Sequence, residues 1–237
     1  MVYDELWAGG PKLVSGENVF AVGTDAVLLS AFADTAGVKR ACALGCGSGI
    51  ISILLAWNNP KMTVDGIEIQ PESARIASGN TGLNDLNDRI NIIHAALRNY
   101  REIGNAGAYA LVVANPPYFP VGSGKSVESE NLATARDERT CTLKDICKAA
   151  AFFTRWGGKF AMVHRPERLS EVFCAMTECG IEPKRFRFVQ EKASSLPNLI
   201  LVEGRRGGKP GLTIEKPLCI RNEDGTETDY IKSIYHR

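Results

Sequence analysis

The sequence predicts an α/β fold in which one mostly parallel sheet carries helices on both faces and ends in an antiparallel strand. Short apolar runs alternate with longer amphipathic segments along the 237 residues, which is typical of strands interleaved with helices. The connection between the last two apolar runs, EKASSLP, is too short for a crossover helix, so these strands are expected to pair antiparallel. Hydrophobic residues make up 44% of the chain, which is enough for one large core, and we expect a single domain over residues 1–237.

Seven segments are expected to form strands and five to form helices. The expected strands, in chain order, are 40–45, 62–68, 90–95, 109–115, 159–164, 185–190 and 198–204. The expected helices are 25–33, 48–58, 71–82, 143–155 and 166–179. Pro71 and Pro166 support two of these helix starts, because proline fits the first helical turn.

The formal charge is +1, and the charges are unevenly distributed. Residues 1–120 carry 8 basic and 11 acidic side chains, a balance of −3, whereas residues 121–237 carry 20 and 16, a balance of +4. The basic excess is sharpest between Lys184 and Lys209, where 7 basic residues stand against Glu191 and Glu203. Such a cluster suits a phosphate backbone, although snorkelling side chains on a solvated face would give the same count.

Composition also limits the setting in which the chain is expected to act. It shows no charged leader followed by an apolar segment, and no apolar run near the roughly 20 residues that span a bilayer. We therefore expect a cytoplasmic protein without a membrane partner. The seven cysteines show no Cys-x-x-Cys spacing, so no metal site is expected.

A glycine-rich loop, ALGCGSGI, follows the first expected strand and precedes a helix. Its glycines, Gly45, Gly47 and Gly49, allow a sharp turn and a close approach of the backbone to a ligand. A dinucleotide fingerprint would need a further glycine where the chain has Ile50, which favours S-adenosylmethionine (SAM) over NAD. Glu68 ends the next strand, where a carboxylate can accept hydrogen bonds from ribose hydroxyls. The alternative is a cluster of turn glycines and an unrelated glutamate.

The fourth expected strand ends in the quartet Asn115, Pro116, Pro117 and Tyr118. This position is the carboxyl end of a parallel strand, where open α/β sheets bind their ligands. The amide oxygen of Asn115 and the next backbone carbonyl can accept the two N–H bonds of an amine, while Tyr118 offers a face for stacking. The prolines would keep the carbonyl in place, and a proline turn that merely caps the strand is the alternative.

Together, ALGCGSGI, Glu68 and NPPY resemble the class I SAM-dependent amino-methyltransferases. Four longer segments, FAVGTDAVLLSAF, NPPYF, MVHRPERL and EGRRGGKPGL, are similar to the bacterial family that methylates N6 of adenine 37 in valine tRNA. The resemblance covers nearly the whole chain. It implies a Rossmann-like, seven-stranded class I methyltransferase sheet, SAM as cofactor, tRNA as partner, and a monomer or homodimer. It also implies that residues 1–37 cover the cofactor and that residues 205–237 form a C-terminal extension.

The resemblance assigns roles to individual residues. Asn115, Pro116, Pro117 and Tyr118 would hold the target amine. The implied cofactor site comprises Phe20, Gly23, Thr24, Asp25, Gly45, Cys46, Gly47, Ser48, Gly49, Glu68, Ile69, Ala96, Leu97 and Asn115. The implied RNA-binding set, together with the charge count, comprises Lys184, Arg185, Arg187, Arg205, Arg206 and Lys209. Helix N-capping is an alternative role for Thr24 and Asp25.

Two departures from the family pattern concern the cofactor. Ala43 and Ala96 stand where acidic residues are usual, and each loss is expected to weaken polar contacts with SAM by about 1 kcal/mol. Three other functions remain open at this point: methylation of another RNA or DNA base amine, methylation of glutamine N5 in a translation factor, and a SAM- or RNA-binding module without turnover.

Overall fold

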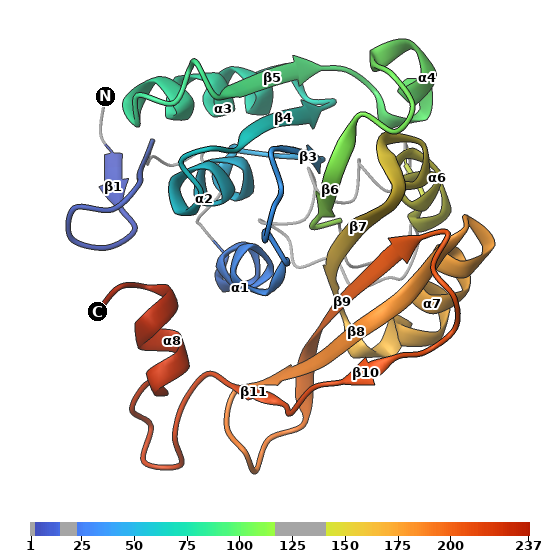
Figure 1. The fold of residues 1–237 in the computed structure, drawn as a ribbon. Helices are drawn as coiled ribbons and strands as arrows, with labels where there is room; N and C mark the ends of the chain where they lie inside the picture. The colour runs from blue at the N-terminus through green and yellow to red at the C-terminus, as the bar shows by residue number, and fades with distance from the viewer. Residues whose placement is uncertain (1–2, 15–22, 117–140) are drawn as a thin grey trace, which may run out of the picture.

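A computed structural model describes residues 3–14, 23–116 and 141–237 (Figure 1). Within this part of the chain, a nine-stranded sheet has the strand order β10-β8-β9-β7-β6-β3-β4-β5, with β11 paired to β8 beyond the path. The strands are β3 Arg40–Leu44, β4 Thr63–Glu68, β5 Ile90–His94, β6 Tyr109–Ala114, β7 Thr154–His164, β8 Ile181–Gln190, β9 Pro197–Arg206, β10 Thr213–Ile214 and β11 Leu218–Cys219. A separate hairpin joins β1 Tyr3–Glu5 to β2 Lys12–Val14.

Helices cover both faces of the sheet. They are α1 Thr24–Phe32, α2 Ile50–Asn58, α3 Pro71–Leu83, α4 Tyr100–Ile103, α6 Leu143–Phe153, α7 Leu169–Glu178 and α8 Asp229–Ile234, with short 3-10 turns η1 Leu97–Asn99 and η2 Pro166–Arg168. None of the helices in the described ranges is long and apolar enough to cross a membrane.

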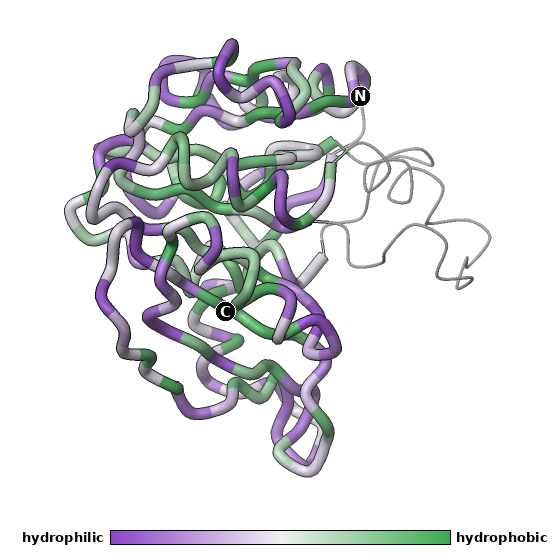
Figure 2. Tube along the Cα trace, turned by 90° about the vertical axis from the view of Figure 1, so that its right-hand side faces the viewer, coloured by the Kyte–Doolittle hydropathy of each residue, from purple (hydrophilic) through white to green (hydrophobic). Residues whose placement is uncertain are grey.

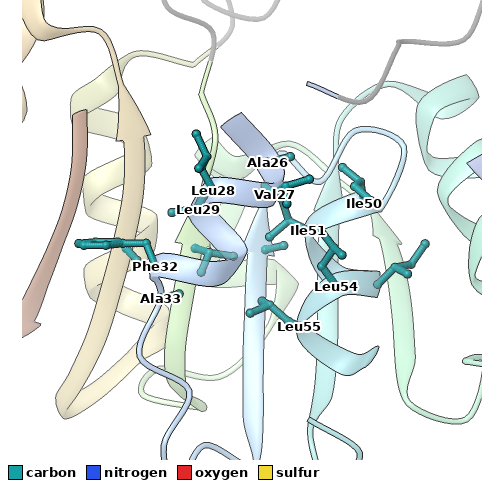
Figure 3. Packing of buried hydrophobic residues seen from close by; sticks show 14 of the residues in the cluster. Ala26, Val27, Leu28, Leu29, Phe32, Ala33, Ile50, Ile51, Leu54 and Leu55 are labelled. Atoms are coloured by element: carbon teal, nitrogen blue, oxygen red, sulfur yellow. The ribbon is translucent and has the colours of Figure 1, made fainter. Parts of the chain in front are cut away.

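The sheet divides the interior into two hydrophobic clusters. Along β3, Ala41 and Ala43 belong to the cluster that includes α1 and α2, whereas Cys42 and Leu44 belong to the cluster that includes α6 and α7. This alternation follows from the two-residue period of a strand. Figure 3 shows α1 and α2 directing their apolar side chains toward each other and the sheet. The tube in Figure 2 accordingly alternates between hydrophobic stretches in the interior and hydrophilic stretches at the periphery.

The predicted α/β fold is confirmed, and so are all seven predicted strands. Strands β5, β4, β3, β6 and β7 are parallel, and β9 pairs antiparallel with both β7 and β8. The short strands β10 and β11, which the sequence did not indicate, extend the sheet by pairing with β8. The core of the sheet therefore has the predicted strand count, and the C-terminal residues enlarge it.

Several element boundaries differ from the predictions for identifiable reasons. The helix expected over 48–58 begins only at Ile50, because Gly49 has a φ of 85° that no α-helix contains. The helix expected over 143–155 ends at Phe153, since Thr154 already pairs with Tyr109 in the sheet. Strand β8 starts at Ile181 rather than Arg185, and a shift in register between Pro183 and Arg185 accommodates the proline.

Both ends of the described chain pack against the same side of the molecule. Ile231 of α8 is buried beside α1, and the Trp7 ring lies 4.7 Å from the ring of His236. Leu13 of the N-terminal hairpin is buried in the same hydrophobic cluster as α1 and α2. The C-terminal extension was expected to start at residue 205, which lies inside β9, because this strand runs to Arg206.

The register places the ends of the central strands at one edge of the sheet. Leu44 of β3 pairs with Ile67 of β4 and with Ala114 of β6, which in turn pairs with Met162 of β7. The residues that follow these strands therefore meet at this carboxyl edge. The glycine loop and Asn115 are brought together there.

Candidate functional site

The glycine loop links β3 to α2 through backbone conformations that favour glycine. Gly45, Gly47 and Gly49 have φ values of 65°, 54° and 85°. A Cβ added to Gly45 or Gly47 would meet no atom of the described residues within 4 Å, so this part of the structure leaves space for a ligand beside them. A Cβ on Gly49 would lie 3.1 Å from the Cβ of Ala77, which shows that this glycine is also needed for packing on α3.

Glu68 ties the glycine loop to the end of β4. It is 5% exposed, and its carboxylate accepts hydrogen bonds from the backbone N–H of Gly47 and of Gln70, both at 2.8 Å. Each of the two carboxylate oxygens thus accepts one backbone N–H, which fixes the carboxylate beside the glycine loop. The glycine loop and Glu68 together fit SAM, and the contact of Glu68 with its ribose stays a prediction.

Asn115 follows β6 and is held by a residue from the start of α1. Its amide Nδ2 donates to Oδ2 of Asp25 at 3.1 Å, while Oδ1 of Asp25 accepts from the backbone N–H of Ala26 at 2.9 Å. Because the nitrogen and the oxygen of an amide lie on different sides of its carbon, this contact directs Oδ1 of Asn115 away from Asp25. Asp25 can therefore fix the orientation of the amide.

Neither Thr24 nor Asp25 is the N-cap of α1, although Oδ1 of Asp25 accepts from the N–H of Ala26 in the first turn. Helix α1 begins at Thr24, and its N-cap position is occupied by Gly23, which has no side chain to cap the helix. The carboxylate of Asp25 contacts Asn115, 90 residues away in the sequence. No local sequence signal reveals this contact.

The other implied site residues are placed as follows. Pro116 is buried next to Asn115, whereas Phe20, Pro117 and Tyr118 lie outside the described residues. The side chain of Cys46 is buried, with its Sγ 2.9 Å from a Cβ built on Gly66, so Cys46 can offer only its backbone to a ligand. Ser48 is half-buried in the glycine loop. The remaining three, Ile69, Ala96 and Leu97, are half-buried after β4 and β5 at the carboxyl edge. Ala43 is buried in the hydrophobic core.

His164 ends β7 at the same edge, where the sequence favours a turn residue over one that lines the pocket. It is 1% exposed, and its Nδ1 accepts a hydrogen bond from the backbone N–H of Arg165 at 2.8 Å. Burial, followed by the positive charge of Arg168, lowers the pKa of His164 from 6.5 to about 4. The imidazole is therefore neutral at physiological pH.

Of the basic residues predicted to bind RNA, Arg205 and Arg206 lie at the opposite edge of the sheet from Asn115. Arg187 does not, because it pairs with Leu201, the partner of Val163 near the carboxyl end of β7. Arg205 pairs with Lys159, which is level with Leu111 at the start of β6. Asn115 comes four residues after Leu111, a separation of about 13 Å along the strand. Arg205 is distant from Asn115 because β9 runs antiparallel to β7 and therefore ends at the opposite edge from it.

Most of these six residues also have partners within the protein. Arg185 forms ion pairs with Glu203 and Glu215, and Arg187 donates to the carbonyl of Lys216. Arg206 donates to the carbonyl oxygens of Phe152 and Thr154, and Lys184 donates to the carbonyl of Lys209. Arg205 and the side chain of Lys209 are exposed. The structure therefore does not gather the six residues into one open surface beside Asn115.

The described residues contain no group of three His, Cys, Asp or Glu side chains that could bind a metal ion. All seven cysteines are free, and Cys42, Cys46 and Cys147 are buried.

Similarity to known proteins agrees with this geometry. The model of the family described as methyltransferase small domain matches residues 12–171, which is more than half of the chain. The chain is 28% identical over 209 residues to the tRNA1(Val) (adenine(37)-N6)-methyltransferase of Aeromonas hydrophila, covering 88% of this chain and 85% of that protein. It is 29% identical over 206 residues to the protein of the same name from Tolumonas auensis, covering 86% and 83%.

Among solved structures, a predicted O-methyltransferase from Agrobacterium tumefaciens aligns with a TM-score of 0.74 at 21% identity. The alignment covers 90% of this chain and 95% of that one. At this identity the likeness shows the fold alone.

Proposed function

The chain belongs to the methyltransferase small domain family and is a SAM-dependent methyltransferase, and we propose that its methyl acceptor is N6 of an adenine in tRNA, specifically adenine 37 of valine tRNA. Its sheet is the Rossmann-like sheet of the class I methyltransferases. The observation that carries the proposal is the amide of Asn115, oriented by Asp25 at the carboxyl edge beside the glycine loop.

Asn115 and Pro116 would prepare the amine of the acceptor. The N6 amine of adenine is a poor nucleophile because its lone pair is delocalised into the ring. Oδ1 of Asn115 would accept one N–H and the carbonyl of Pro116 the other, which favours a pyramidal nitrogen with an available lone pair. Asp25 fixes the orientation of the amide for this role, because it binds the amide nitrogen.

The cofactor would be held by Gly45, Gly47 and Glu68, with residues 1–37 covering it. SAM supplies an electrophilic methyl group on a sulfonium sulfur, so the chain needs no nucleophile of its own. The task of the protein is then to align the amine with that methyl group, which makes the fixed orientation of Asn115 important.

Two observations support tRNA as the acceptor over a protein glutamine. The relatives that match most of the chain are named as tRNA methyltransferases. In addition, exposed side chains gather where β7 starts and β9 ends: Arg155, Trp156 and Arg205. The ring of Trp156 lies against Gly207. Cations beside an exposed aromatic ring suit phosphates and an unstacked base.

The acceptor is tested by methylation of three substrates with radiolabelled SAM. They are a valine tRNA transcript, the same transcript with guanine at position 37, and a glutamine-containing translation factor. The expected result is label on the first transcript only, recovered as N6-methyladenosine after digestion to nucleosides. Asn115→Ala is expected to reduce this transfer at least a hundredfold while SAM still binds. Label on the translation factor, or equal labelling of both transcripts, would refute the proposed acceptor.

A further inference from the structure

We propose that Asn80 of α3 is a positioning residue of the cofactor site, which sets the shape of the glycine loop and couples it to the N-terminal hairpin. Asn80 is completely buried, and each end of its amide is used. Nδ2 donates to the backbone carbonyl of Ser48 at 2.9 Å, and Oδ1 accepts from the backbone N–H of Val14 at 2.8 Å. This inference depends on SAM as the cofactor and is independent of the identity of the acceptor.

The glycine loop is held from two sides at consecutive residues. Glu68 of β4 binds the N–H of Gly47, and Asn80 of α3 binds the carbonyl of Ser48. Gly49 packs on Ala77, one turn before Asn80 on the same helix. The loop therefore rests on α3 through both a hydrogen bond and a close packing contact. A loop fixed in this way is preorganised, so less conformational freedom is lost when a ligand binds.

The same helix also carries the N-terminal hairpin. Asn84, one turn after Asn80, accepts from the N–H of Lys12 at 2.8 Å and donates to the carbonyl of Lys12 at 2.7 Å. Asn80 and Asn84 thus present two amides that pair with the backbone of β2, as a neighbouring strand would. Only Asn80 also reaches the glycine loop, so its amide connects the hairpin with the cofactor site.

This difference between two asparagines of one helix gives a matched experiment. In Asn80→Asp the side chain keeps an oxygen for the N–H of Val14, but an ionised carboxylate cannot donate to the carbonyl of Ser48 and repels it. In Asn84→Asp the bonds from Nδ2 to the carbonyls of Lys12 and Asn80 are lost in the same way, and no bond to the glycine loop is changed. Asn84→Asp therefore weakens hairpin docking alone, whereas Asn80→Asp keeps the bond to β2 and acts on the glycine loop.

The readout is the affinity for SAM and for its demethylated product, S-adenosylhomocysteine, measured by calorimetry on the full chain without RNA. We expect Asn80→Asp to weaken both affinities about tenfold and Asn84→Asp to leave them within about twofold, which is the difference of one hydrogen bond. Thermal unfolding of each variant shows whether it is folded at the temperature of the titration. If Asn80→Asp does not fold, Asn80→Ser serves, because its shorter side chain cannot span both partners.

Equal loss of affinity in the Asn80 and Asn84 variants, or no loss in either, would overturn the proposal, because Asn80 would then be only an anchor of the hairpin. Failure of the wild-type chain to bind SAM would overturn it as well. Neither result depends on whether tRNA is the acceptor, since no acceptor is present.

Discussion

Substitution of Asp25 tests whether this carboxylate acts through Asn115. The contact between Asn115 Nδ2 and Asp25 Oδ2 is 3.1 Å long and involves a charged acceptor. Such a bond contributes about 2 kcal/mol, against about 1 kcal/mol for a neutral one. If this energy serves to orient the amide in the transition state, Asp25→Ala should lower kcat about thirtyfold and Asp25→Asn about fivefold, at about 1.4 kcal/mol per factor of ten.

The assay is steady-state methyl transfer to tRNA, with SAM affinity measured separately by calorimetry. We expect the loss to fall on kcat, with SAM affinity changed by less than about twofold. A double-mutant cycle sharpens the test, because Asp25→Ala should have almost no further effect in an Asn115→Ala background. Full additivity of the two substitutions would refute the positioning role. A loss confined to SAM affinity would instead make Asp25 a cofactor ligand, as the family resemblance implies.

The remaining predictions concern the glycine loop, the buried histidine and the basic surface. Gly47→Ala should weaken SAM binding at least tenfold with a small loss of stability, whereas Gly49→Ala, whose Cβ would press on α3, should lower both SAM affinity and the melting temperature. The pKa of His164 is lowered from 6.5 to about 4, so between these pH values the folded chain binds fewer protons than the unfolded chain. The free energy of unfolding should therefore fall by up to about 3 kcal/mol as the pH drops from 6.5 to 4, which urea titrations at each pH would measure. His164→Asn should remove most of this slope, and an unchanged slope would contradict the assignment. Replacing Arg205 and Trp156 by alanine should weaken tRNA binding about tenfold and reduce its salt dependence, while SAM affinity stays constant; unaltered tRNA affinity would show that this surface is merely solvated.

Most of the framework of the site follows from local sequence signals. The glycine loop, the acidic residue at the end of β4 and the amide at the end of β6 each stand directly after an apolar run, so their meeting at one edge is a consequence of parallel strands. The contacts that hold them are not local. Asp25 reaches Asn115 across 90 positions, and Asn80 reaches Ser48 across 32 and Val14 across 66. A single asparagine or aspartate in a helix carries no sign of such a partner.

The placement of the basic cluster shows a different limit, because the necessary signal was present. An antiparallel last strand was predicted, and its direction implies that its final residues lie at the amino edge of the sheet. Counting charges along the chain from Lys184 to Lys209 ignores this reversal. It also ignores that alternate residues of a strand face inward, where Arg185 pairs with the buried Glu203.

The two non-local contacts have a common consequence for how the site is built. β2 reaches the glycine loop through Asn80, and α1 reaches the amide through Asp25. The glycine loop and Asn115 are therefore both in contact, directly or through Asn80, with N-terminal elements that precede the first strand of the central sheet. A change in how these elements pack would alter SAM affinity and the orientation of Asn115 together. Under the proposed function, a change around Arg205, at the opposite edge of the sheet from Asn115, would alter only the binding of the acceptor. Separate measurement of SAM affinity, kcat and tRNA affinity across the variants described above distinguishes these two groups of residues.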